Sequence, residues 1–114
     1  MNKIERKIKR QIRTRAKIKG TADRPRLSVY RSNRFMYAQL IDDEIKKTIV
    51  GVSEKHLKEA LAGKIARARA LGILLAKKAI DKKVKKVIFD RGSYSYHGRV
   101  SGIAQGAREG GLEF

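Results

Sequence analysis

The sequence predicts an α/β fold, an α+β domain with a mixed sheet whose elements follow the order βββαβα after a basic N-terminal arm. Between residues 26 and 53, three short segments alternate polar and apolar residues, and a period of two is typical of strands. After residue 57 the apolar residues recur every third or fourth position, as in an amphipathic helix. A meander followed by a strand reached through a helix is expected to place the helices on one face of the sheet.

Charge is the second strong signal. The 114 residues suit one domain, and 41% of them are hydrophobic, which is enough for a core. The formal net charge is +18, with a pI near 10.7, so a polyanion is the expected partner. No apolar run approaches the roughly 20 residues that span a bilayer, and the N-terminus lacks the apolar region of a signal peptide. Nucleic acid in the cytoplasm, with no membrane, is therefore the expected partner and location.

Residue types limit the possible cofactors. The absence of cysteine excludes disulfides, thiolate nucleophiles and cysteine metal sites, and two histidines cannot complete a tetrahedral zinc site. The acidic run at residues 42–44 could coordinate a hard cation, although adjacent acids in a turn are more often solvated. We expect no cofactor and no metal.

Residues 1–22 are predicted to form a flexible basic RNA-binding arm, followed by a globular RNA-binding domain at residues 23–114. Residues 1–26 hold eleven basic and two acidic residues, a net charge of +9. Ile4, Ile8 and Ile12 form a narrow apolar stripe at helical spacing, but like charges four residues apart weaken an isolated helix. We expect the arm to fray when free and to become helical on a polyanion. Gly20 and Pro25 mark its end.

Three strands should follow the arm. Residues 26–30 and 35–41 are predicted to form a hairpin around a turn at residues 32–34, and residues 47–53 form the third strand. The apolar residues expected to face the helices are Leu27, Val29, Met36, Ala38 and Leu40. The opposite face is expected to be exposed and to display Arg26, Ser28, Tyr30, Phe35, Tyr37 and Gln39.

That opposite face has two interpretations. Sheets that bind RNA combine aromatic and polar side chains, because aromatic planes pack on bases while polar groups reach phosphates and 2′-hydroxyls. Alternatively, the face is merely solvated, and its aromatic residues fill gaps between the strands. The adjacent basic arm favours RNA binding.

The core helix is predicted at residues 57–82 and a closing helix at residues 99–109, with a short strand at residues 84–89 between them. The inward residues of the core helix should include Leu61, Ile65, Ala68, Leu71, Leu75 and Ala79. In the closing helix, Gly102 and Gly106 each weaken the helix by about 1 kcal/mol relative to alanine. The six lysines among residues 77–86 form either a second phosphate-binding patch or a soluble helix end.

Residues 90–99 are the densest polar and aromatic cluster, and they follow a strand, where α/β proteins often place ligand sites. Gly92 and Gly98 permit close approach of a phosphate, and a helix beginning near Gly98 would offer free N–H groups. A small phosphodiesterase would use His97 as a general base oriented by Asp90, but no metal cluster or nucleophile motif accompanies them. Asp90 can equally cap its own loop.

Five ordered blocks resemble the bacterial form of the ribosomal protein eighteen family of the large subunit. They are RPRLSVYRSN at residues 24–33, YAQLIDD at 37–43, FDRG at 89–92, YHGRV at 96–100 and AREGGLEF at 107–114. The resemblance implies a non-enzymatic constituent of the large ribosomal subunit that binds 5S rRNA beside 23S rRNA in the central protuberance. It also implies other 5S rRNA-binding ribosomal proteins as neighbours, and we expect the chain to be a monomer within the ribosome.

The candidate RNA-binding residues fall in three groups, which the residue patterns and the resemblance both select. The arm contributes Lys3, Arg6, Lys7, Lys9, Arg10, Arg13, Arg15, Lys17, Lys19 and Arg24. The hairpin contributes Arg26, Ser28, Tyr30, Arg31, Ser32, Asn33, Arg34, Tyr37 and Gln39. The loop contributes Asp90, Arg91, Gly92, Tyr94, Tyr96, His97, Gly98 and Arg99. Besides the phosphodiesterase, a general nucleic-acid chaperone is the alternative to specific RNA binding, and it would bind duplex DNA and unrelated RNA equally well.

Overall fold

Four strands and three helices make up the fold in the computed structural model, which describes residues 2–15, 19–32, 35–57, 63–92, 94 and 96–114, without the side chains of residues 14, 15 and 56. The elements are α1 (Lys3–Arg15), β1 (Arg26–Arg31), β2 (Met36–Asp42), β3 (Lys47–Ser53), a 3-10 turn (Glu54–His56), α2 (Lys64–Asp81), β4 (Ile88–Asp90) and α3 (Arg99–Glu109). The predicted order of elements is confirmed.

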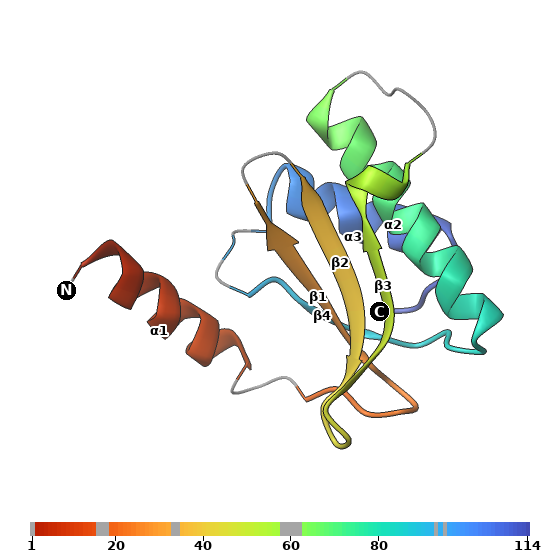
Figure 1. Cartoon of the computed structure of the whole chain (residues 1–114), viewed down its shortest axis with the longest axis horizontal. Helices are drawn as coiled ribbons and strands as arrows, with labels where there is room; N and C mark the ends of the chain where they lie inside the picture. The colour runs from red at the N-terminus through yellow and green to blue at the C-terminus, as the bar shows by residue number, and fades with distance from the viewer. Residues whose placement is uncertain (1, 16–18, 33–34, 58–62, 93, 95) are drawn as a thin grey trace.

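The sheet is mixed, as predicted, with the strand order β3-β2-β1-β4. β2 runs antiparallel to both β1 and β3, whereas β4 pairs with β1 in parallel. The helices α2 and α3 pack on one face of this sheet, and α1 lies to the side of the other face (Figure 1). The register places Tyr30 opposite Tyr37 and Leu27 opposite Leu40, so aromatic residues pair on one face and core residues on the other.

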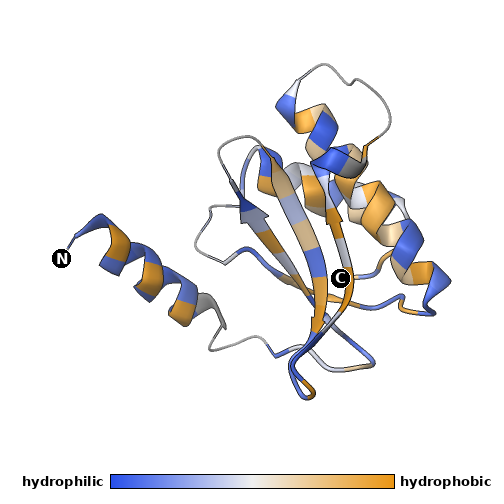
Figure 2. Ribbon diagram, viewed as in Figure 1, coloured by the Kyte–Doolittle hydropathy of each residue, from blue (hydrophilic) through white to orange (hydrophobic). Residues whose placement is uncertain are grey.

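The core lies between the sheet and the two C-terminal helices. Its largest fully buried apolar side chains are Leu27, Met36, Leu40, Leu71, Leu75 and Ile103. Apolar residues on the strands and on α2 follow the predicted periods of two and about 3.6, and they appear as orange bands in Figure 2. Within the part of the chain that the structure describes, no helix is long and apolar enough to cross a bilayer.

Helices α2 and α3 approach each other at glycine positions. A Cβ atom added to Gly72 would lie 2.2 Å from the carbonyl oxygen of Ile103, and one added to Gly106 would lie 2.0 Å from that of Arg69. Backbone therefore packs directly on backbone, which only glycine allows. The interpretation of Gly106 as a mere weakness of the helix is incomplete, because this residue makes the close approach possible.

The predicted start of the core helix is wrong. Leu57 follows the 3-10 turn and is not helical, residues 58–62 lie outside the described residues, and α2 begins at Lys64. Gly63 has a φ of +89°, which a right-handed helix cannot contain, so the helix starts after it. Ile65, expected inside, is 59% exposed.

The strand predicted at residues 84–89 is confined to Ile88–Asp90. The preceding segment pairs elsewhere, since the Val87 N–H donates to the Glu113 carbonyl at 3.0 Å and the Glu113 N–H donates to the Lys85 carbonyl at 2.8 Å. The C-terminal segment therefore pairs with residues 85–87, whereas the Ile88 N–H donates to the Pro25 carbonyl, next to β1, at 2.9 Å.

Helix α2 ends in a Schellman motif with a lysine in the left-handed position. The Val84 N–H donates to the Ala79 carbonyl, the Lys83 N–H donates to the Ile80 carbonyl, and Lys83 has a φ of 63°. Glycine adopts this conformation without the strain that a Cβ atom causes.

We expect Lys83→Gly to stabilise the protein by about 0.5–1 kcal/mol, because it relieves the left-handed strain at this exposed position. Urea unfolding measures the change. Lys82→Gly is the matched control, since Lys82 has a φ of −94° and gains nothing from glycine. Equal effects of the two substitutions would contradict the prediction.

Candidate nucleic-acid interface

The arm, the hairpin and the loop that the sequence selected meet at Tyr94. The Lys7 ammonium lies 5.7 Å from the centre of the Tyr94 ring, and the Arg31 guanidinium lies 5.8 Å from it. The Arg31 N–H also donates to the Tyr94 hydroxyl at 3.1 Å, while Arg91 donates to the Tyr94 carbonyl at 2.8 Å. A single aromatic residue thus connects the three segments and stands among cations.

A groove runs between α1 and the sheet. Its volume is about 350 Å³, and Lys7 and Gln11 of α1 line it together with Ser28, Val29, Tyr30, Gln39, Gly92 and Tyr94. The groove therefore combines a cationic wall, amide and hydroxyl groups, and two aromatic rings. Such a surface suits single-stranded or looped RNA, whose bases stack while cations track the backbone.

The aromatic residues of the hairpin lie on the face of the sheet opposite the helices. The rings of Tyr30 and Tyr37 have centroids 5.8 Å apart, and Tyr30 is 54% exposed. Lys55 covers the Phe35 ring, with its ammonium 5.2 Å from the centroid. Tyr30 is therefore available to a ligand, in agreement with the predicted aromatic face.

The prediction that Arg26 and Ser28 are exposed is wrong, because both are buried. Arg26 donates to both carboxylate oxygens of Asp43, at 3.0 and 3.1 Å, and to Asp90 at 2.7 Å. The hydrogen bond with Asp43 is the main cause that raises the pKa of Arg26, and Asp90 adds to it, whereas burial acts in the opposite direction. Arg26 is thus held inside the protein as a permanent cation.

The two aspartates of this cluster also fix backbone. Asp43 accepts from the Gly20 N–H at 2.6 Å, which anchors the end of the arm, and the fully buried Asp90 accepts from the Gly92 N–H at 2.8 Å. The hypothesis that Asp90 caps its own loop is therefore confirmed. The expectation of a solvated acidic turn is wrong for Asp43, and for the buried Asp42, which accepts from the Glu44 N–H.

The arm is helical in the structure. Asn2 caps α1 by accepting from the Glu5 N–H at 2.8 Å, a cap that the sequence analysis missed although asparagine is a preferred N-cap residue. All basic side chains of the arm that the structure describes are exposed. They are those of Lys3, Arg6, Lys7, Lys9, Arg10, Arg13, Lys19 and Arg24. The Arg15 side chain and Lys17 lie outside the described part, and fraying of the free arm stays a prediction.

The remaining candidates lie around the loop and the hairpin turn. Ser32 closes that turn by hydrogen bonds with Phe35, while Asn33 and Arg34 lie outside the described residues. Arg91, Tyr96 and His97 are exposed, whereas Gly92 is buried. Tyr37, Gln39, Tyr94, Gly98 and Arg99 are partly buried.

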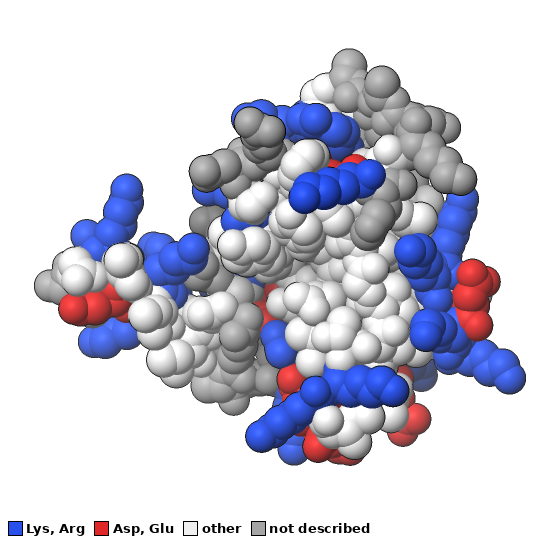
Figure 3. Space-filling model, viewed as in Figure 1, with Lys and Arg blue, Asp and Glu red and all other residues white. Residues whose placement is uncertain are grey.

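Basic side chains surround a neutral centre on this side of the molecule. Figure 3 shows Lys and Arg over α1 and around the rim of the domain, with uncharged residues over the strands. The cations are thus placed to hold a phosphate backbone at the edges while the middle of the sheet is free for bases and riboses. Among the residues that the structure describes, no group of three His, Cys, Asp or Glu side chains could hold a metal ion.

Comparisons with known proteins agree with this picture. A family model described as "Ribosomal L18 of archaea, bacteria, mitoch. and chloroplast" matches residues 1–114. The large ribosomal subunit protein uL18 of Thermotoga neapolitana is 53% identical, over 96% of this chain and 93% of the relative. That of Clostridium novyi is 47% identical, over 99% and 96%. Since the family model spans the whole chain and these relatives share about half of its residues, the chain belongs to the ribosomal L18 family.

Proposed function

We propose that this protein binds 5S rRNA and helps to attach it to 23S rRNA in the central protuberance, next to other 5S rRNA-binding ribosomal proteins. Membership of the L18 family makes it a non-enzymatic protein of the large ribosomal subunit. The phosphodiesterase alternative is therefore not retained. The observation that carries the proposal is the meeting of arm, hairpin and loop at Tyr94, beside a groove with cationic and aromatic walls.

The arm and the domain should contribute differently. Exposed cations on α1 attract any polyanion, because neutralised phosphates release counterions whatever the RNA sequence. The domain side of the groove, with Ser28, Tyr30, Gln39 and Tyr94, offers ring faces and hydrogen-bonding groups, so it can distinguish one folded RNA from another. Affinity should then depend mainly on the arm, and selectivity on the domain.

Competition binding between 5S rRNA and an unrelated structured RNA tests the proposal. In the arm variant, Lys3, Arg6, Lys7, Lys9, Arg10 and Arg13 become glutamine, which preserves helix propensity. We expect the affinity for 5S rRNA to fall at least about tenfold at physiological salt, with a smaller salt slope, while part of the preference for 5S rRNA remains.

A matched control removes the same charge from the other end of the molecule. Lys77, Lys78, Lys82, Lys83, Lys85 and Lys86 are exposed and also number six, and their replacement by glutamine should affect binding much less. Equal losses of affinity in the arm variant and in the control would indicate general electrostatic attraction. Equal affinity of the wild type for both RNAs would contradict the proposal and favour a general nucleic-acid chaperone.

A further inference from the structure

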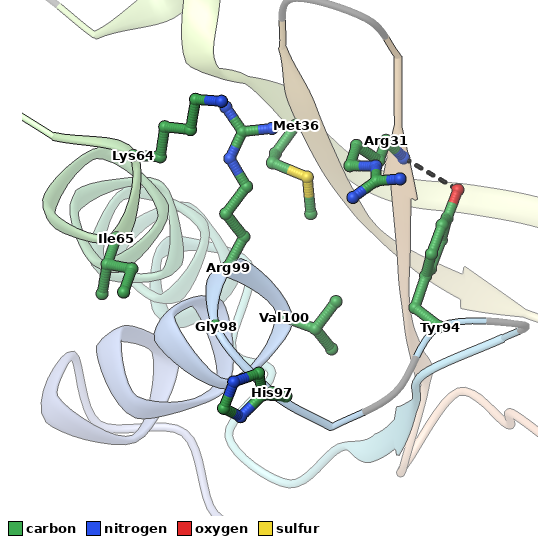
Figure 4. A pocket seen from close by; sticks show the side chains of 9 residues that line it. All are labelled: Arg31, Met36, Lys64, Ile65, Tyr94, His97, Gly98, Arg99 and Val100. Atoms are coloured by element: carbon green, nitrogen blue, oxygen red, sulfur yellow. Dashed lines mark hydrogen bonds between the residues drawn. The ribbon is translucent and has the colours of Figure 1, made fainter.

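A second cavity lies where α2 and α3 begin, beyond the tip of the hairpin. Its volume is about 680 Å³, within the range of about 300–1,000 Å³ that is usual for small-molecule sites. Figure 4 shows Lys64 and Arg99 rising from the first turns of the two helices on one side, and Arg31 and Tyr94 on the other, with Met36 and Val100 between them. Arg99 is among the residues that the sequence pattern predicts, whereas Lys64 belongs to no motif and is not among them.

The polar side of this cavity is cationic. Arg31, Lys64 and Arg99 come from three different elements, and no Asp or Glu lines the cavity among the described residues. The Arg99 Nε–H is shielded from solvent and has no hydrogen-bond partner among those residues. A buried donor without an acceptor destabilises a protein by about 1–3 kcal/mol, so a phosphate oxygen that accepts from this N–H, once the Arg99 side chain turns toward the cavity, would offset that loss.

The other side of the cavity is apolar. Met36 and Val100 are buried core residues whose side chains border the space, and the exposed Ile65 forms part of its wall. An inorganic anion would gain nothing from this surface. A nucleotide would, because its base can cover the apolar wall while its phosphate meets the cations.

The cavity adjoins the interface proposed above at Tyr94. Tyr94 borders both this cavity and the groove beside α1, and Arg31 lines the cavity while its backbone N–H binds the Tyr94 hydroxyl. We propose that the cavity holds one unpaired nucleotide of the bound RNA, with its phosphate among Arg31, Lys64 and Arg99 and its base against the apolar wall that includes the exposed Ile65. The inference rests on the proposed function, since RNA is the ligand in both.

Methyl NMR of the full chain tests the cavity without RNA. Met36 is one of two methionines, so its methyl signal in protein labelled with 13C-methyl methionine can be assigned with a Met36→Leu variant. Adenosine monophosphate should shift this signal in a saturable way, and inorganic phosphate at equal ionic strength should not. Lys64→Ala should weaken the response at least about fivefold, as expected for loss of a charged contact, whereas Lys78→Ala on the last turn of α2 should not. An equal response to phosphate, or none to the nucleotide, would overturn the proposal.

Binding to 5S rRNA separates this inference from the function on which it rests. The variant Lys64→Ala/Arg99→Gln should weaken binding about tenfold, and Lys78→Ala/Lys82→Gln, with the same loss of charge, should change it little. If the wild type prefers 5S rRNA but the cavity variant and the control variant bind it with equal affinity, the cavity proposal fails while the proposed function stands. If the wild type shows no preference, the proposed function fails. Lys64 is exposed, so Lys64→Ala alone carries the comparison if the double variant folds poorly.

Discussion

Gly106→Ala is expected to destabilise the domain by about 3 kcal/mol, against the gain of about 1 kcal/mol that helix propensity alone would give. The added methyl group would lie 2.0 Å from the carbonyl oxygen of Arg69, and its nearest neighbours are all backbone atoms of α2. A flexible side chain could rotate away, but a helix backbone cannot. Helices α2 and α3 must therefore separate, and the core contacts of both with the sheet become looser.

Urea unfolding followed by circular dichroism measures this change, and the sign of the effect is decisive. Gly51→Ala in β3 is the control, because a Cβ atom there has no neighbour within 4 Å. Gly102→Ala should fall between the two, since its Cβ atom would lie 3.2 Å from that of Ala68. A Gly106→Ala variant as stable as the wild type would contradict the close approach of the helices.

Asp90→Ala is expected to destabilise the domain by about 3 kcal/mol, the lower end of the usual effect of breaking a buried ion pair, because Arg26 keeps Asp43 as a second partner. Asp90 is fully buried, and its carboxylate accepts from Arg26 at 2.7 Å and from the Gly92 N–H at 2.8 Å. Its removal leaves the Arg26 guanidinium with Asp43 alone. The loop that carries Tyr94 also loses its cap, so RNA affinity should fall at temperatures where the variant is still folded.

Two further variants make this result interpretable. Asp81→Ala removes an exposed aspartate at the end of α2 and should change stability by no more than about 0.5 kcal/mol. The double variant Arg26→Leu/Asp90→Ala should regain part of the loss, because the buried cation that lost a partner is removed, while Asp43 is partly exposed and still accepts from the Gly20 N–H. Thermal or urea unfolding provides the values. If Asp90→Ala is as stable as Asp81→Ala, the buried cluster does not hold the sheet to the loop.

The features that sequence could predict are those with a local cause. Alternation of polar and apolar residues locates β1 and β2 within one residue, and β3 and α3 agree with their predicted ranges. Alternation also puts Arg26 on the polar face, correctly, but cannot indicate that Asp43 and Asp90 cover it. Those aspartates are 17 and 64 residues away, so only the folded sheet brings them to the arginine.

The candidate site divides in the same way. The exposed cations of α1 and the aromatic pair of the hairpin follow from composition and spacing. Lys64 does not, because its sequence neighbourhood resembles any basic helix start, and its place in a cavity depends on where α2 meets Arg31 and Arg99. The sequence also predicts only a weakening effect for Gly106, because helix propensity describes a single helix. The contact that requires glycine at this position lies between α2 and α3.

The parallel pairing of β4 with β1 also determines when the protein can fold during its own synthesis. Residues 26–28 pair with residues 88–90, and the core also includes Ile103 and Leu112, so the core cannot be completed before residue 112 has left the exit tunnel. The basic residues of α1 emerge long before that. Under the proposed function, a newly made chain would therefore present the unselective cations of α1 to nucleic acid before the selective surface of the domain has formed.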